Sequence, residues 1–131
     1  MRQLTLFLAV LPIIFLSYAA RAQQNTPAPP ADVQKVEVVV DSYSFTPDVI
    51  KVTAGKPVEI TLRSVTSLVP HNFTIDDPAS GLNVDVDVPS GKDVTVTFTP
   101  EKKGEFQFYC SKSGIMGSHL KKGMKGTLEV M

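Results

Sequence analysis

Apolar and polar side chains alternate with a period of two from Lys35 to the end of the chain. This alternation is typical of β-strands that bury one face. Turn-forming residues such as the Ala-Gly-Lys-Pro segment at 54–57 separate the alternating segments, and no segment keeps a helical period beyond a turn or two. The pattern predicts about eight short strands, at residues 35–40, 49–53, 58–62, 71–75, 84–88, 94–98, 106–108 and 128–130.

Short strands separated by turns, without an internal repeat, predict an all-β domain. The two architectures that fit are an antiparallel sandwich of two sheets, with about seven to eight strands, and a small barrel. The order of the strands does not follow from the alternation, because the pattern reports only which face of each strand is buried.

The first 22 residues have the features of a signal peptide. Arg2 provides a positive start, residues 4–16 are an apolar run, and Ala20-Arg21-Ala22 has the small-x-small pattern of a cleavage site. The apolar run is shorter than the roughly 20 residues needed to span a bilayer. We expect cleavage after Ala22, export to the periplasm and no membrane span in the mature protein; the alternative is an uncleaved anchor.

Residues 23–34 contain three prolines and few side chains to bury. This composition predicts an extended linker, or alternatively a frayed terminus, ahead of a domain at residues 35–131.

Charge and cysteine content exclude some classes of function. The chain has 13 basic and 13 acidic residues, which provides no basic face for nucleic acid. Its single cysteine, Cys110, cannot form an internal disulfide, so the thiol could serve an intermolecular bridge, a nucleophile or a metal site. We expect a monomer.

Strand parity places four donor side chains at one end of the domain. Cys110 continues the inward face of its strand, and His71 begins a strand on the inward face. Met124 has the inward parity of the last strand, and His119 lies in the loop between. If the strands of His71 and Cys110 are antiparallel, the four side chains meet. One thiolate, two imidazoles and one thioether form a ligand set suited to copper.

Each of these residues also has an ordinary structural interpretation. A buried cysteine often acts as a small apolar residue, and methionine commonly fills gaps in a core. A histidine at the end of a strand is often a hydrogen-bonded polar residue. The combination favours a metal site, because the only cysteine and both histidines of the chain fall where one site needs them.

Three motifs resemble the cupredoxins, the blue-copper family that includes plastocyanin and azurin. They are Pro-His-Asn-Phe around His71, Tyr-Cys ending at Cys110, and His-x4-Met-x-Gly beginning at His119. The resemblance implies a Greek-key β-sandwich and one copper ion that alternates between cuprous and cupric forms. It implies His71, Cys110 and His119 as strong ligands, Met124 as a weak axial ligand, and His119 as the port for electrons.

The segment between Cys110 and His119 departs from the family, which has a shorter loop here. It spans eight residues, 111–118, and includes Gly114 and Gly117. Closing a longer loop is inexpensive, about 0.6 kcal/mol for each doubling of its length. A longer loop can thus reach across the site, but it would hold the ligands less rigidly than a short one. It also makes Met116 a second candidate for the axial ligand, although we expect Met124.

These features predict a periplasmic protein for one-electron transfer. A copper carrier without redox work and a metal-free accessory module are the alternatives, and an enzyme is not expected, because the loop after Cys110 has no carboxylate to orient a histidine. A redox partner could dock near His119 on a positive rim, with acidic residues Asp76, Asp77, Asp85 and Asp87 elsewhere. The rim consists of Lys112, Lys121, Lys122 and Lys125.

Overall fold

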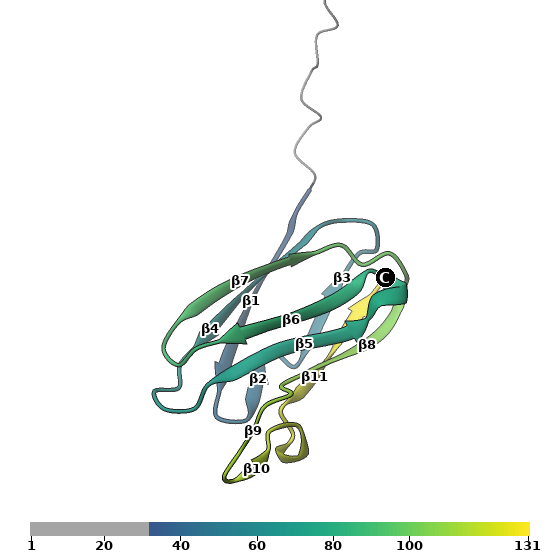
Figure 1. Cartoon of the computed structure of the whole chain (residues 1–131). Helices are drawn as coiled ribbons and strands as arrows, with labels where there is room; N and C mark the ends of the chain where they lie inside the picture. Colours follow the sequence, from purple (N-terminus) through teal and green to yellow (C-terminus); the bar gives the residue numbers. More distant parts are fainter. Residues whose placement is uncertain (1–31) are drawn as a thin grey trace, which may run out of the picture.

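The computed structural model describes residues 32–131, which form two packed β-sheets (Figure 1). The predicted signal peptide, residues 1–22, and all but the last three residues of the predicted linker, residues 23–34, lie outside the described residues. The first strand begins at Gln34, one residue before the expected start of the domain. Within residues 32–131, no helix has the length and apolar character needed to cross a membrane.

One sheet has four strands in the order β2-β1-β4-β7, and the other has five in the order β3-β11-β8-β5-β6. The strands of the first sheet are β1 (Gln34–Asp41), β2 (Ser44–Thr46), β4 (Val58–Ser64) and β7 (Asp93–Phe98). Those of the second are β3 (Val49–Val52), β5 (His71–Asp77), β6 (Leu82–Val88), β8 (Gly104–Tyr109) and β11 (Lys125–Val130). A separate hairpin, β9 (Ser113–Gly114) with β10 (Gly117–Ser118), extends beyond one end of the sandwich (Figure 1). Two single 3₁₀ turns complete the described fold, η1 (Pro78–Ser80) and η2 (Leu120–Lys122).

The predicted β-sandwich is confirmed, with mixed rather than wholly antiparallel sheets. Each of the eight predicted strands is present, whereas β2, β9 and β10 were not predicted, because two or three residues are too few to show an alternation. Two pairs, β1 with β4 and β3 with β11, are parallel, which corrects the expected antiparallel pairing. The alternation could not distinguish these cases, because a strand buries the same face whichever way its neighbour runs.

The core lies between the two sheets and consists mainly of Val, Ile, Leu and Phe side chains. Three phenylalanines from β2, β5 and β8 pack against one another below the end where β5 begins. The rings of Phe73 and Phe108 are stacked with their centroids 5.1 Å apart, and Phe45 meets both edge-on. Because β7 is at the edge of its sheet, its inward residues are only half-buried. The core beneath the end of the sandwich nearest His71 is therefore filled by closely packed aromatic rings.

Candidate metal centre

The four predicted ligand residues come together at the end of the sandwich from which the β9–β10 hairpin extends. His71 is the first residue of β5, Cys110 follows β8 directly, His119 precedes η2, and Met124 precedes β11. Because β5 and β11 both pair antiparallel with β8, the starts of these two strands lie beside the end of β8. Each of the four side chains is at most 5 % exposed. The structure therefore brings His71, Cys110 and His119 together, with Met124 buried next to them in the chain fold, while the role of the four residues as ligands stays a prediction.

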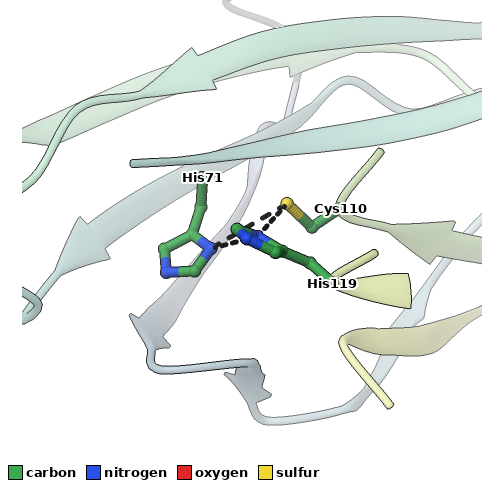
Figure 2. Close-up of side chains that lie close together, drawn as sticks. All are labelled: His71, Cys110 and His119. Atoms are coloured by element: carbon green, nitrogen blue, oxygen red, sulfur yellow. Dashed lines mark hydrogen bonds between the residues drawn. The ribbon is translucent and has the colours of Figure 1, made fainter. Parts of the chain in front are cut away.

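Three donor atoms converge within this group. The Nδ1 atoms of His71 and His119 are 3.2 Å apart, and the Sγ atom of Cys110 lies 3.9 Å from the first and 3.4 Å from the second. Figure 2 shows the two rings and the thiol pointing toward one another. With bonds of about 2.0–2.1 Å to nitrogen and about 2.3 Å to sulfur, as zinc makes them, three donors in a trigonal arrangement are roughly 3.5–3.8 Å apart. The donor atoms therefore fit around one metal ion with only small adjustments.

The hydrogen bonding of His71 argues against a purely structural role for this histidine. Its Nδ1 atom faces only the other two donors, and its buried Nε2 atom has no hydrogen-bond partner within residues 32–131. A buried polar atom without a partner costs about 1–3 kcal/mol, so an ordinary core histidine would have acquired one. The hydrogen-bond partners of the His71 ring within residues 32–131 are thus the other two donor atoms, which its Nδ1 atom faces.

Both imidazoles favour the neutral form, which is the form that binds metals. Burial lowers the pKa of His71 below its ordinary value of 6.5, and the neighbouring His119 lowers it further. Burial also lowers the pKa of His119, with contributions from the ammonium groups of Lys122 and Lys112. Protons therefore compete weakly with a cation for these nitrogen atoms at neutral pH.

The stability of the metal-free protein is expected to decrease as the pH falls below 6.5. As the pH falls, the histidines of the unfolded chain, with ordinary pKa values, take up protons before those of the folded protein do. The contribution of the two neutral histidines to the free energy of unfolding is therefore fully present above pH 6.5, and it is lost as the pH falls through their lowered pKa values in the folded state. Urea unfolding between about pH 7.5 and pH 5 measures this dependence. In His119→Gln, which keeps one of the two groups, the loss should be smaller; an equal loss in both proteins would contradict the assignment.

Met124 and Met116 differ sharply in their environments. Met124 is fully buried, and its backbone is tied to two other members of the group: its carbonyl accepts from the Cys110 N–H at 3.1 Å, and its N–H donates to the His119 carbonyl at 3.1 Å. Met116, at the tip of the β9–β10 hairpin, is 74 % exposed. The backbone therefore holds Met124, rather than Met116, next to the donors.

A side-chain network around Asn72 joins the start of β5 to the segment after Cys110. The Asn72 backbone N–H points at the Cys110 Sγ atom at 3.5 Å, and its Oδ1 atom accepts from the Ser111 N–H at 2.8 Å. Its Nδ2 atom has three acceptors, the Asp85 carboxylate at 2.8 Å and the hydroxyls of Ser111 and Thr74 at 2.7 and 3.2 Å. Such contacts set the orientation of a ligand and tune a metal site. The sequence analysis did not find this network, although an Asn next to one donor and a Ser next to another were a signal for it.

The long loop after Cys110 is more ordered than its length suggested. The β9–β10 hairpin occupies its middle, and the His119 N–H donates to the Lys112 carbonyl at 3.0 Å, which closes the loop at its base. A cavity of about 330 Å³ lies beside His119, lined by the hairpin, by Tyr43 and by residues 68–70. Its rim includes three strongly exposed apolar side chains, those of Leu68, Ile115 and Met116.

The predicted positive rim is only partly free. Lys112 forms an ion pair with Asp87 at 2.8 Å, and the ammonium of Lys122 lies 4.1 Å from the centre of the Tyr43 ring. The expectation that the acidic residues lie elsewhere is wrong for two of them. Asp87 pairs with Lys112 and Asp85 bonds to Asn72, because β6 is the neighbour of β5. Lys121 and Lys125 remain exposed.

Comparison with known proteins supports the fold and the family. Auracyanin B is similar in structure, with a TM-score of 0.63 and 22% sequence identity over 79% of this chain and 92% of that one. Auracyanin A, a "blue" copper protein from Chloroflexus aurantiacus, has a TM-score of 0.60 and 19% identity over 76% and 99% of the two chains. The metal-binding domain of a Cu(I)-exporting P-type ATPase from Streptococcus pneumoniae, solved with Cu(I), has a TM-score of 0.58 and 21% identity over 76% and 86%. No curated protein sequence matches the chain.

The sequence model of the cupredoxin-like domain family matches residues 7–130, nearly the whole chain. This match covers the two-sheet fold and each residue of the donor cluster. The chain therefore belongs to the family of cupredoxin-like domains.

Proposed function

We propose that the protein binds one copper ion and transfers electrons one at a time in the periplasm. The observation that carries the proposal is the buried convergence of the His71 and His119 Nδ1 atoms with the Cys110 Sγ atom, all within 4.8 Å of one another. Met124 would provide the weak fourth ligand. The copper would supply reversible one-electron redox chemistry, for which a trigonal set of two imidazoles and one thiolate with a weak thioether is suited.

The residues of the chain would hold the donors in place during this cycle. Backbone hydrogen bonds link Cys110 to Met124 and Met124 to His119, and the Asn72 network links His71 to the segment after Cys110. Burial of the donors excludes water, which would otherwise add ligands to the oxidised form. A site that changes little between its two oxidation states needs little reorganisation, which favours rapid electron transfer.

The visible spectrum of the copper-loaded protein tests this proposal. We expect an intense sulfur-to-copper charge-transfer band and a reversible midpoint potential in voltammetry. A colourless cupric protein, or one without a reversible potential, would contradict electron transfer through a thiolate site.

A copper carrier without redox work is the second candidate. One structural neighbour is the metal-binding domain of a Cu(I) exporter, and the exposed Met116 borders the cavity beside His119. Thioethers bind Cu(I), so Met116 could receive the ion on its way in or out. Two results together would favour the carrier: slower transfer of Cu(I) from Met116→Leu than from the unsubstituted protein to a soluble chelator, and the absence of a reversible midpoint potential.

We also propose a redox partner that docks over the cavity beside His119. The exposed apolar side chains of Leu68, Ile115 and Met116 provide the contact, and Lys121 and Lys125 provide the positive charge still free to attract an acidic partner. Charge attraction of this kind weakens with salt. Electron-transfer rates with an acidic redox protein should therefore fall as the ionic strength rises; rates that do not change with salt would contradict the role of the lysines.

A further inference from the structure

Tyr43 adopts a backbone conformation that tyrosine rarely takes. It lies in the two-residue turn between β1 and β2, where Asp41 pairs with Ser44, and its φ is 61°. It is the only residue other than glycine with a positive φ within residues 32–131. This region of φ is favoured by glycine and asparagine and disfavoured by bulky side chains. Unfavourable backbone conformations persist where the surrounding structure holds them, and they cluster at functional sites.

The ring of Tyr43 contacts both candidate ligand histidines. Its centroid is 5.0 Å from that of His119, with the ring planes at 82°, and 6.3 Å from that of His71, at 87°. Both are edge-to-face arrangements, the favourable geometry for aromatic pairs. The Nζ atom of Lys122 lies 4.1 Å from the Tyr43 centroid, within the range of a cation–π contact. The half-buried ring therefore packs against His119, which precedes η2, and against Lys122, the last residue of η2.

Besides Tyr43, the His119 ring contacts the side chains of two other donor residues, His71 and Cys110. The backbone of His119 is fixed by the bonds of its N–H to Lys112 and of its carbonyl to Met124. The hydrogen-bond partners of its Nδ1 atom within residues 32–131 are the other two donors, His71 and Cys110. The eight-residue loop between Cys110 and His119 bonds to the His119 backbone through the Lys112 carbonyl, and within residues 32–131 it forms no hydrogen bond to the His119 ring.

We propose that Tyr43, held in place by Lys122, orients the His119 ring toward the other donors and shields them from solvent. This positioning role would replace the constraint that a shorter loop provides. The role of Tyr43 in copper binding rests on the proposed function, whereas its effect on the ring exists without the metal and is measured first.

Three substitutions at Tyr43 separate the side chain from the backbone. Tyr43→Phe keeps the ring, whereas Tyr43→Asn and Tyr43→Gly remove it and place in the turn the residues that this φ prefers. In NMR spectra of the metal-free protein, nuclear Overhauser contacts between position 43 and His119 should persist in Tyr43→Phe. In Tyr43→Asn and Tyr43→Gly, the nuclear Overhauser contacts between the His119 ring and the side chains of His71 and Cys110 should weaken, with a cooperative unfolding transition retained.

Copper binding provides the second measurement. Competition with a coloured Cu(I) chelator should show about tenfold weaker binding for Tyr43→Asn, which is the lower end of the usual loss when a contact that orients a ligand is removed. For Tyr43→Phe, which keeps the ring, the affinity should change by less than about twofold. Lys121 and Lys122 are a matched pair of exposed neighbours, and only Lys122 lies over the ring. Lys122→Gln should therefore weaken Cu(I) binding more than Lys121→Gln does.

Unchanged contacts of the His119 ring with His71 and Cys110 in Tyr43→Asn, or Cu(I) affinity equal to that of the unsubstituted protein, would overturn the proposal. If the unsubstituted protein failed to bind copper while the contacts of the His119 ring with His71 and Cys110 still depended on the ring at position 43, the copper function would fail and the positioning of His119 by Tyr43 would stand.

Discussion

Replacing Cys110 with serine is expected to abolish the intense visible absorption of the copper-loaded protein. The same substitution should weaken copper binding by more than about 100-fold, which exceeds the usual cost of losing an outer contact. A thiolate is a soft anionic donor, whereas a serine hydroxyl stays protonated and is a poor ligand for cuprous copper. Absorption spectra and competition titrations with a Cu(I) chelator measure both effects.

The metal-free fold should tolerate this substitution. Serine is slightly smaller than cysteine, and its hydroxyl can accept the Asn72 N–H that now points at the Cys110 Sγ atom. Urea unfolding of the metal-free variant should therefore show a loss of at most about 2 kcal/mol. A charge-transfer band that survived in the folded serine variant would show that the thiolate is not a ligand.

Replacing Gly126 with alanine is expected to destabilise the protein by about 3 kcal/mol or more, the upper end of the cost of overpacking. A Cβ atom at this position would overlap the ring of Phe108 and the backbone carbonyl of Asp48. Neither can move easily. Phe108 is fully buried and stacked on Phe73, and the Asp48 carbonyl accepts from the Thr127 N–H at 2.7 Å. The backbone conformation of Gly126 is not the cause, since its φ is not among the positive values.

Gly114 provides the matched control for this experiment. It also lacks a positive φ, but a Cβ atom there would meet nothing within 4 Å. Gly114→Ala should therefore change the free energy of unfolding by no more than about 0.5 kcal/mol, as for other surface substitutions. Equal stability of the two variants in urea would show that the close approach of β11 to Phe108 does not limit what position 126 can hold.

Much of the fold and of the candidate site could be predicted from the sequence. The eight longer strands follow from alternation, because each needs only a buried and an exposed face to be recognised. The inward placing of His71 and Cys110 at the ends of their strands likewise follows from parity. These features depend on neighbours along the chain, so a single sequence contains the information.

The contacts that hold the site together could not be predicted in this way. Asn72 bonds to Asp85 and Ser111, Lys112 pairs with Asp87, and Tyr43 packs against a histidine 76 residues further along the chain. Each depends on which strands are neighbours and on how individual rings and amides are turned. Alternation carries neither kind of information.

The sequence by itself determined the class of fold, the faces of the strands and the four candidate donor residues, because alternation along a strand and the chemistry of a side chain are local features of the chain. Only the tertiary structure decided the parallel strand pairs, the ordering of the long loop and the placing of Tyr43 against both imidazoles. These features arise when segments distant in the chain pack together, and the energy of that packing depends on distances and angles that exist only in the folded protein.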